Sequence, residues 1–186
     1  MTEKLNINLN AGNDIKQNFL LFMDEVTMSS ARNIIEWIFM CNMGEEQFDL
    51  LNLVICSPGG DLNAAFAVVD CMKGSSTPIR TIGLGEIASA GLLMFIAGEK
   101  GQRLLTPNTS ILSHQYTWGS FGKEHELLAT VKQFDLTTKK MISHYKKCTG
   151  LEEDMIREKL LPPQDMWLSA QEAKKLGICD QVKDLY

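Results

Sequence analysis

Histidine and cysteine are scarce in this sequence of 186 residues, which contains three of the first and five of the second. No two cysteines form a CxxC pair, and most of them stand in apolar segments such as Val54-Ile55-Cys56. An odd number of cysteines in such surroundings is typical of buried free thiols in a reducing compartment. We expect neither a metal ion nor a cofactor.

Basic clusters and long apolar runs are also lacking. The formal net charge is −5, whereas a protein that binds nucleic acid needs a basic patch, so we expect no nucleic-acid partner. The longest apolar run falls far short of the roughly 20 residues that a membrane span needs. Residues 1–6 lack the apolar core of a signal peptide. These absences predict no membrane association and a cytoplasmic location.

The composition is that of a folded globular protein, with 45% hydrophobic and 22% charged residues. The length suits one domain of ordinary size, and no repeat, low-complexity tract or linker divides it. We expect a single domain over residues 1–186. Within it, residues 1–17 are polar and without a period, which predicts an extended or mobile arm.

The first hundred residues alternate between strand-length apolar runs and helical patterns. Helix-capping residues, Ser57-Pro58-Gly59-Gly60 and Pro78 separate these segments. Such strand–turn–helix units favour right-handed crossovers and an α/β fold with a parallel sheet. The pattern predicts strands at 19–23, 50–56 and 79–84 and helices at 31–41, 62–73 and from 92 onward.

The second half has shorter strands and one long helix. Residues 127, 131, 134, 138, 141 and 145, which are apolar apart from the threonine at 138, repeat at alternating spacings of four and three along the predicted helix 123–149. Such a seam favours a partner helix, although the helix packing on its own sheet is the open alternative. The pattern also predicts strands at 103–105, 110–113 and 178–182, an exposed β-ribbon at 118–122, and helices that begin near 150 and 170 with capping boxes.

One stretch, residues 85–98, places a single hydroxyl among small residues between an apolar strand and an apolar helix. Glycines at 85 and 91 and alanines at 88 and 90 surround Ser89, so that backbone and substrate can approach its hydroxyl closely. The free N–H groups of a first helical turn would lie beside it and can stabilise an oxyanion. Taken alone, however, the stretch is better explained as a tightly packed turn in which Ser89 caps the helix than as a site with a nucleophile.

A serine nucleophile needs a base that takes its proton, and histidine is the usual one. His125 and His144 lie in charged parts of the long helix, which predicts solvated surface positions. His114 follows an apolar strand and precedes a loop, so a scaffold holds its ring within reach. Asp165 ends a proline-bounded loop and could orient an imidazole. Each of these two is, taken singly, more often a packing histidine or a turn residue.

Taken together, four blocks resemble the signature blocks of the ClpP family, the proteolytic subunit of the Clp protease. The spacing agrees with that family, with 25 residues from Ser89 to His114 and 51 from His114 to Asp165. The predicted helix 123–149 lies where that family has its handle, and the resemblance runs from about residue 17 to the C-terminus. The blocks are Ser57-Pro58-Gly59-Gly60, residues 85–91, Leu112-Ser113-His114-Gln115 and residues 165–173.

The resemblance implies a ClpP/crotonase-type spiral of repeated β-β-α units with a protruding handle helix. It implies Ser89 as nucleophile, His114 as general base and then acid, and Asp165 as the residue that orients His114. The backbone N–H groups of Gly60 and Ala90 would form the oxyanion hole, and a glycine there lets an amide turn towards the serine.

The resemblance also implies partners. Family members form heptameric rings, and two rings stack through their handles into a tetradecamer that encloses the active sites. An AAA+ unfoldase such as ClpX, ClpA or ClpC threads substrates into the chamber. We therefore expect a homo-oligomeric serine endopeptidase that acts on unfolded protein. Its substrate would be an extended peptide, paired as a strand beside the Leu62 segment and the ribbon near Trp118.

Three alternatives compete with a ClpP-type peptidase. An acyl-CoA-handling enzyme of the crotonase type shares the fold and a backbone oxyanion hole, but it would not need Ser89, His114 and Asp165 together. A catalytically silent ring subunit would typically lack one of these three residues. A Ser–Lys signal-peptide peptidase would need a lysine in a comparable block and a membrane anchor, and the sequence has neither.

Overall fold

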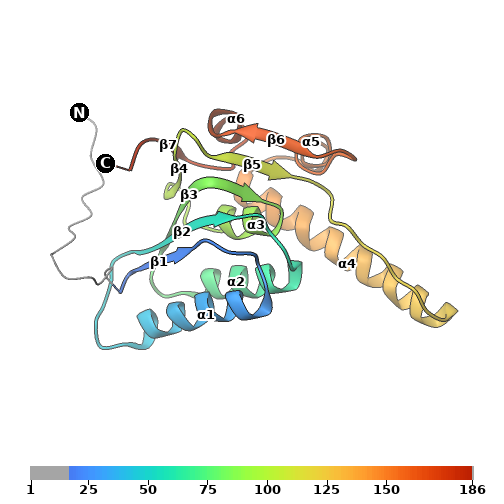
Figure 1. Cartoon of the computed structure of the whole chain (residues 1–186), viewed down its shortest axis with the longest axis horizontal. Helices are drawn as coiled ribbons and strands as arrows, with labels where there is room; N and C mark the ends of the chain where they lie inside the picture. The colour runs from blue at the N-terminus through green and yellow to red at the C-terminus, as the bar shows by residue number, and fades with distance from the viewer. Residues whose placement is uncertain (1–16, 186) are drawn as a thin grey trace.

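The computed structural model of the protein describes residues 17–185. Within them, seven strands form one sheet, in which β1, β2, β3, β4 and β7 lie side by side and parallel, and β5 and β6 branch from β3 (Figure 1). The strands are β1 (Phe19–Phe22), β2 (Leu51–Ser57), β3 (Ile79–Ala88), β4 (Arg103–Leu105), β5 (Ser110–Ser113), β6 (Met166–Ser169) and β7 (Gln181–Val182). The helices are α1 (Met28–Met43), α2 (Leu62–Gly74), α3 (Ala90–Ile96), α4 (Glu124–Thr149), α5 (Glu153–Lys159) and α6 (Ala170–Lys175).

Helices α1, α2 and α3 cover one face of the sheet (Figure 1). Their starting points follow from short-range signals in the sequence. The Thr27 side chain accepts a hydrogen bond from the Ser30 N–H at the start of α1, and Asp61 does the same for Ala64 at the start of α2. The apolar face of each helix then packs on the sheet, which is why the predicted α/β alternation folds into two layers here.

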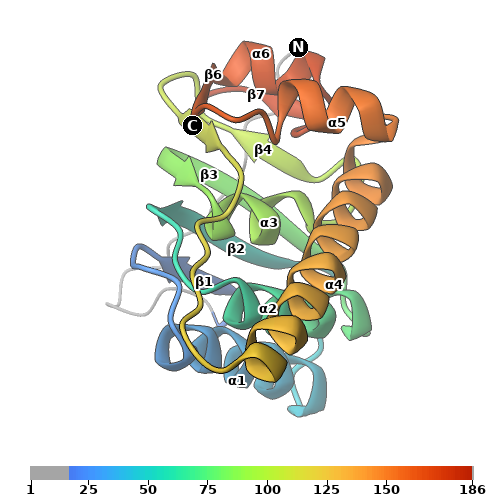
Figure 2. The ribbon, with the colours of Figure 1, turned by 90° about the vertical axis from the view of Figure 1, so that its right-hand side faces the viewer.

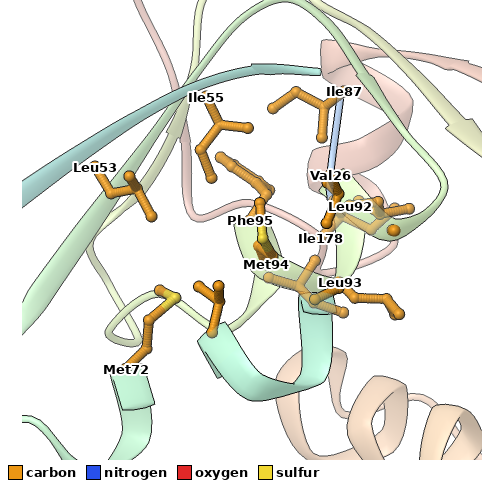
Figure 3. Packing of buried hydrophobic residues seen from close by; sticks show 14 of the residues in the cluster. Val26, Leu53, Ile55, Met72, Ile87, Leu92, Leu93, Met94, Phe95 and Ile178 are labelled. Atoms are coloured by element: carbon orange, nitrogen blue, oxygen red, sulfur yellow. The ribbon is translucent and has the colours of Figure 1, made fainter. Parts of the chain in front are cut away.

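The core beneath these helices fixes α3 on the sheet. Ile55 and Ile87 point from the strands toward Phe95 of α3 (Figure 3). All seven residues of α3 are buried. Full burial of one large apolar side chain contributes about 1.5–3 kcal/mol, so α3 has little freedom to move relative to β3. Ser89, which joins β3 to α3, is therefore fixed in position as well.

Strand β3 changes partner along its length. Its first part, from Thr81 to Gly83, pairs with β4, and its last part, from Glu86 to Ala88, pairs with β5. Gly85 lies between the two parts with φ of 62°, a conformation that favours glycine. Strand β5 in turn pairs with β6 in antiparallel orientation. The ends of β3 and β5 and the start of β6 therefore meet at one edge of the sheet.

Helix α4 projects away from the sheet (Figures 1 and 2). Its buried residues, Met141, Ile142, His144 and Tyr145, all lie near its C-terminal end. The first half is exposed and carries Leu127, Val131 and other apolar side chains. Gly150, with φ of 79°, ends the helix in the left-handed conformation that was expected there.

Two sequence-based expectations are wrong, and one lies outside the described residues. Residues 118–122 form no strand, because Trp118 packs on Phe134 of α4, with ring centroids 5.6 Å apart, instead of pairing with a neighbour. Thr149 does not cap α5, because its hydroxyl donates to Tyr145 O at 2.7 Å within α4. Leu62 opens α2, as the helix predicted over 62–73 requires. The arm predicted over residues 1–17 lies almost wholly outside the described residues.

Candidate active site

Ser89 stands at a one-residue turn between β3 and α3. Its φ of 51° and ψ of −119° make it the one non-glycine residue with positive φ among residues 17–185. Such a conformation costs on the order of 1–3 kcal/mol and persists where the surroundings impose it. Here the Ser89 N–H donates to Leu112 O at 2.9 Å, and the Ser89 carbonyl accepts from Leu92 N–H at 3.0 Å. This is the strand–turn–helix geometry that exposes a nucleophilic serine at its tip.

The side chain of Ser89 does not act as a helix cap. Although Ser89 occupies the N-cap position of α3, its hydroxyl makes no capping hydrogen bond. Gly91 and the other residues that follow are fully buried, whereas Ser89 is half-buried. The simpler interpretation of this stretch, a serine that caps the helix, does not fit this geometry. Within the described part of the chain, the hydroxyl is free to meet another group.

Gly59 is packed directly against Ser89. A Cβ atom at Gly59 would lie 2.7 Å from Ser89 Cβ and 3.1 Å from the Ala90 nitrogen. Real Cβ atoms essentially never come as close as 2.7 Å to another non-bonded heavy atom. Gly59 has φ of 95° and Gly60 φ of 142°, so both conformations favour glycine. Gly59 thus brings the backbone of its loop closer to Ser89 than a residue with a Cβ atom could.

The loop that carries these glycines is fixed by hydrogen bonds. The Val26 N–H donates to Gly59 O and the Asp61 N–H donates to Val26 O, both at 2.7 Å, and the Gly59 N–H donates to Ser57 Oγ at 3.1 Å. None of the hydrogen bonds formed within residues 17–185 uses the Gly60 N–H. The Ala90 N–H belongs to the first turn of α3 and has no acceptor within the helix. Both amides can therefore donate to a ligand.

His114 and Asp165 face each other across the β5–β6 pair. Ser113, the last residue of β5, pairs with Met166, the first residue of β6. His114 follows Ser113 and Asp165 precedes Met166, so these two residues lie opposite each other. His114 Nδ1 and Asp165 Oδ1 are 3.8 Å apart, which is an ion-pair distance but longer than a hydrogen bond. The His114 side chain is 26% exposed and the Asp165 side chain 64%. Solvent thus reaches both groups.

The structure brings these groups to one edge of the sheet but does not join all of them. Ala88 pairs with Leu112, so Ser89 and His114 lie at the ends of neighbouring strands. Among the hydrogen bonds of the described residues, none connects Ser89 Oγ to the His114 ring. The structure thus forms two pairs at a shared edge, Ser89 with Gly59 and His114 with Asp165.

The expectation that His144 lies on the solvated surface is wrong. The side chain is buried between α4 and the α2–α3 layer, and its Nε2–H donates to Leu93 O at 2.8 Å. Its Nδ1 accepts from the Lys73 ammonium at 3.3 Å. Burial lowers the pKa of His144 to about 4, although the bond to Leu93 opposes this effect. His125, by contrast, is exposed as expected.

Sequence reasoning also missed the residues that surround His114. Ser113 is fully buried, and its hydroxyl lies 3.2 Å from the Tyr145 hydroxyl. Gln115 donates to Leu161 O at 3.0 Å. Burial raises the pKa of Tyr145 to about 12, against the opposing effect of its bond to Ser113. The only sequence signal for these contacts was that Ser113 and Gln115 flank His114.

Five free cysteines and no candidate metal cluster complete the inventory of reactive side chains in residues 17–185. Two of the thiols, Cys41 and Cys179, are buried, and the other three are half-buried. None of the helices described is long and apolar enough to cross a membrane.

Comparison with known proteins gives one consistent family. A sequence model described as Clp protease matches residues 8–185. The ATP-dependent Clp protease proteolytic subunit 1 of Leifsonia xyli subsp. xyli is 32% identical over 171 residues, which cover 91% of this chain and 85% of that protein. The subunit of the same name from Chlamydia caviae is 30% identical over 165 residues, which cover 88% and 85%.

The fold comparison agrees with the sequence comparison. The structure of a ClpP1 N165D mutant from Listeria monocytogenes matches with a TM-score of 0.80 and covers 90% of this chain and 92% of that one, at 24% identity. This likeness confirms the expected ClpP-type fold with its projecting handle helix α4. Together with the matched family model, these relatives show that the chain belongs to the Clp protease family.

Proposed function

We propose that the protein is a serine endopeptidase that hydrolyses unfolded polypeptides. Ser89 is the nucleophile, His114 the general base and then the general acid, and Asp165 the group that orients His114. The observation that carries the proposal is the strained turn at Ser89, with Gly59 packed against Ser89 and near the Ala90 nitrogen. The names of the relatives, which are proteolytic subunits, support the same activity.

The orientation of His114 supports its role as a base. Its Nδ1 faces the Asp165 carboxylate at 3.8 Å, which favours the tautomer with the proton on Nδ1 and leaves Nε2 to accept a proton from Ser89. For this step Ser89 Oγ must approach His114 Nε2 to within hydrogen-bond distance. Such contacts often tighten only when substrate binds.

The reaction then follows the acyl-enzyme route. Ser89 Oγ attacks the scissile carbonyl carbon while its proton moves to His114, and the oxyanion accepts hydrogen bonds from Gly60 and Ala90 N–H. His114 returns the proton to the leaving amine as the C–N bond breaks. A water molecule then attacks the resulting ester in the same way, with His114 taking its proton and returning it to Ser89 Oγ. Removal of one oxyanion donor in such sites slows the reaction about 100- to 1,000-fold.

The assembly proposed for this peptidase is a single catalytic domain per chain, arranged in heptameric rings that stack as a tetradecamer. The exposed apolar residues on the first half of α4, including Leu127 and Val131, support a contact between handles. The proposed substrate supply is an AAA+ unfoldase, in keeping with the ATP dependence named in the relatives. The free thiols support the cytoplasmic location.

Two other functions remain alternatives, and the site disfavours both. A silent ring subunit would have no use for the strained turn at Ser89, which costs stability without a gain in packing. A crotonase-type acyl-CoA enzyme would not require His114 and Asp165 to lie opposite each other.

The test is labelling with a fluorophosphonate probe, which reacts with activated serines. The wild-type protein should be labelled, Ser89→Ala should not, and Ser143→Ala, at an exposed serine on α4, should be labelled like the wild type. Asp165→Asn should slow peptide hydrolysis about 1,000- to 10,000-fold. Light scattering on the same samples reports whether they are assembled. Labelling that persists in Ser89→Ala, or its absence from an assembled wild-type protein, would refute the peptidase.

A further inference from the structure

The two residues that flank His114 both hold the segment that leads to Asp165. The Ser113 hydroxyl donates to Leu160 O, and the Gln115 side chain donates from Nε2 to Leu161 O at 3.0 Å. Leu160 and Leu161 are consecutive, follow the end of α5, and precede Asp165 by only a few residues. The strand end that carries His114 is thus attached to the loop that carries Asp165 at two adjacent carbonyls.

A buried tyrosine extends this attachment to the handle helix. Tyr145 of α4 is 1% exposed and Ser113 is 0% exposed, and their hydroxyl oxygens are 3.2 Å apart. Because a carbonyl can only accept, the Ser113 proton is engaged with Leu160 O, so the Tyr145 hydroxyl donates to Ser113 Oγ. The hydrogen bonds therefore run from α4 through Ser113 to the chain at Leu160.

Asp165 depends on its backbone for its position. Its side chain is 64% exposed, and its one ion-pair contact within residues 17–185 is the 3.8 Å approach to His114. On its C-terminal side the backbone is held by the β5–β6 ladder, which begins at Met166. On its N-terminal side, Pro162 and Pro163 have no N–H to donate, so the nearest anchors before Asp165 are the carbonyls of Leu160 and Leu161.

We propose that Gln115, Ser113 and Tyr145 are positioning residues, which act on catalysis by keeping Asp165 across from His114. This inference rests on the proposed peptidase function. Gln115 is the residue to change, because its side chain is exposed and its bond to Leu161 O can be removed without opening a cavity.

The first measurement separates positioning from mere support of the fold. Gln115→Met keeps the length of the side chain and removes the donor, and it should lower kcat roughly tenfold with KM unchanged. Gln171→Met, at an exposed glutamine of α6, should change neither quantity. A rise in KM alone, or an unchanged kcat, would overturn the inference.

A double-mutant cycle asks whether Gln115 acts through Asp165. In an Asp165→Asn background, Gln115→Met should cause no further loss in the rate of fluorophosphonate labelling. If the two losses multiply instead, Gln115 acts elsewhere and the inference fails. Tyr145→Phe, which keeps the ring in place, should give a smaller loss of kcat that is likewise absent in the Asp165→Asn background. A wild-type protein without activity or labelling would refute the peptidase itself, whereas multiplicative losses in an active protein refute only the positioning role.

Discussion

Lowering the pH should weaken the fold through one side chain, His144. The imidazole is 4% exposed, donates to Leu93 O and accepts from Lys73, so the neutral ring has a partner at each nitrogen. A proton added at Nδ1 would face the Lys73 ammonium, and Lys147 adds a further unfavourable charge, while Asp70 opposes them. The folded protein therefore resists protonation at this residue.

The size and sign of the effect follow from linkage. Burial lowers the pKa of His144 from 6.5 to about 4. Below the unfolded value the unfolded chain binds a proton that the folded chain does not, so stability is present at neutral pH and is lost as the pH falls toward 4. The full difference corresponds to about 3 kcal/mol, of which about 2 kcal/mol is lost by pH 5. Such a loss is a large part of the stability of an ordinary domain.

Urea unfolding at pH 7 and pH 5, at one fixed protein concentration, measures this loss. His144→Gln keeps a donor for Leu93 O but cannot titrate, so its free energy of unfolding should fall by about 2 kcal/mol less than that of the wild type over the same interval. His125→Gln, at an exposed histidine of the same helix, should behave like the wild type. If His144→Gln shows the full wild-type loss, the reasoning about the buried imidazole is refuted.

Two further substitutions test the site and the core. Gly59→Ala should lower fluorophosphonate labelling about a hundredfold, because its Cβ displaces Ser89; Gly150→Ala, which also has positive φ but open space around it, should cost about 1–2 kcal/mol of stability and leave labelling intact. Labelling of Gly59→Ala at the wild-type rate would contradict the close approach. Asp180→Asn should cost about 3–5 kcal/mol in urea unfolding, since it breaks the buried pair with Arg103. The exposed ion pair between Asp135 and Lys139 is the control, because Asp135→Asn should cost less than about 0.5 kcal/mol. Equal losses of stability in Asp180→Asn and Asp135→Asn would contradict the role of burial.

The elements that the sequence predicted correctly are those with a local physical cause. The start of α6 is an example, because Ser169 accepts from Glu172 N–H while the Glu172 carboxylate accepts from Ser169 N–H, within four consecutive residues. Gly150 likewise ends α4 through its own positive φ. Where one short segment carries both partners of an interaction, the sequence is sufficient.

The failures share the opposite cause. Residues 118–122 have the glycine-spaced aromatics of a strand, but Trp118 packs on Phe134 of α4 and Phe121 is exposed. His144 looked solvated because lysines follow it at 146 and 147, yet the burial of Met141 and Tyr145 on the same helix turns it toward α3. Both errors arise where a segment meets an element that is distant in sequence, and no local pattern reports such a contact.

The candidate site combines the two cases. The small residues around Ser89 could be seen in the sequence, but they fit a helix cap as well as a nucleophile. What separates these alternatives is the φ of 51° at Ser89, and that angle is imposed from outside the segment, by Leu112 O on β5 and by the burial of α3. The opposition of His114 and Asp165 depends in the same way on the register of β5 against β6. A shift of that register by one residue would turn one of the two side chains to the other face of the sheet. The chemistry proposed for this chain therefore depends on strand pairing as much as on the three side chains, and the bonds from Ser113 and Gln115 act at the point where that pairing ends.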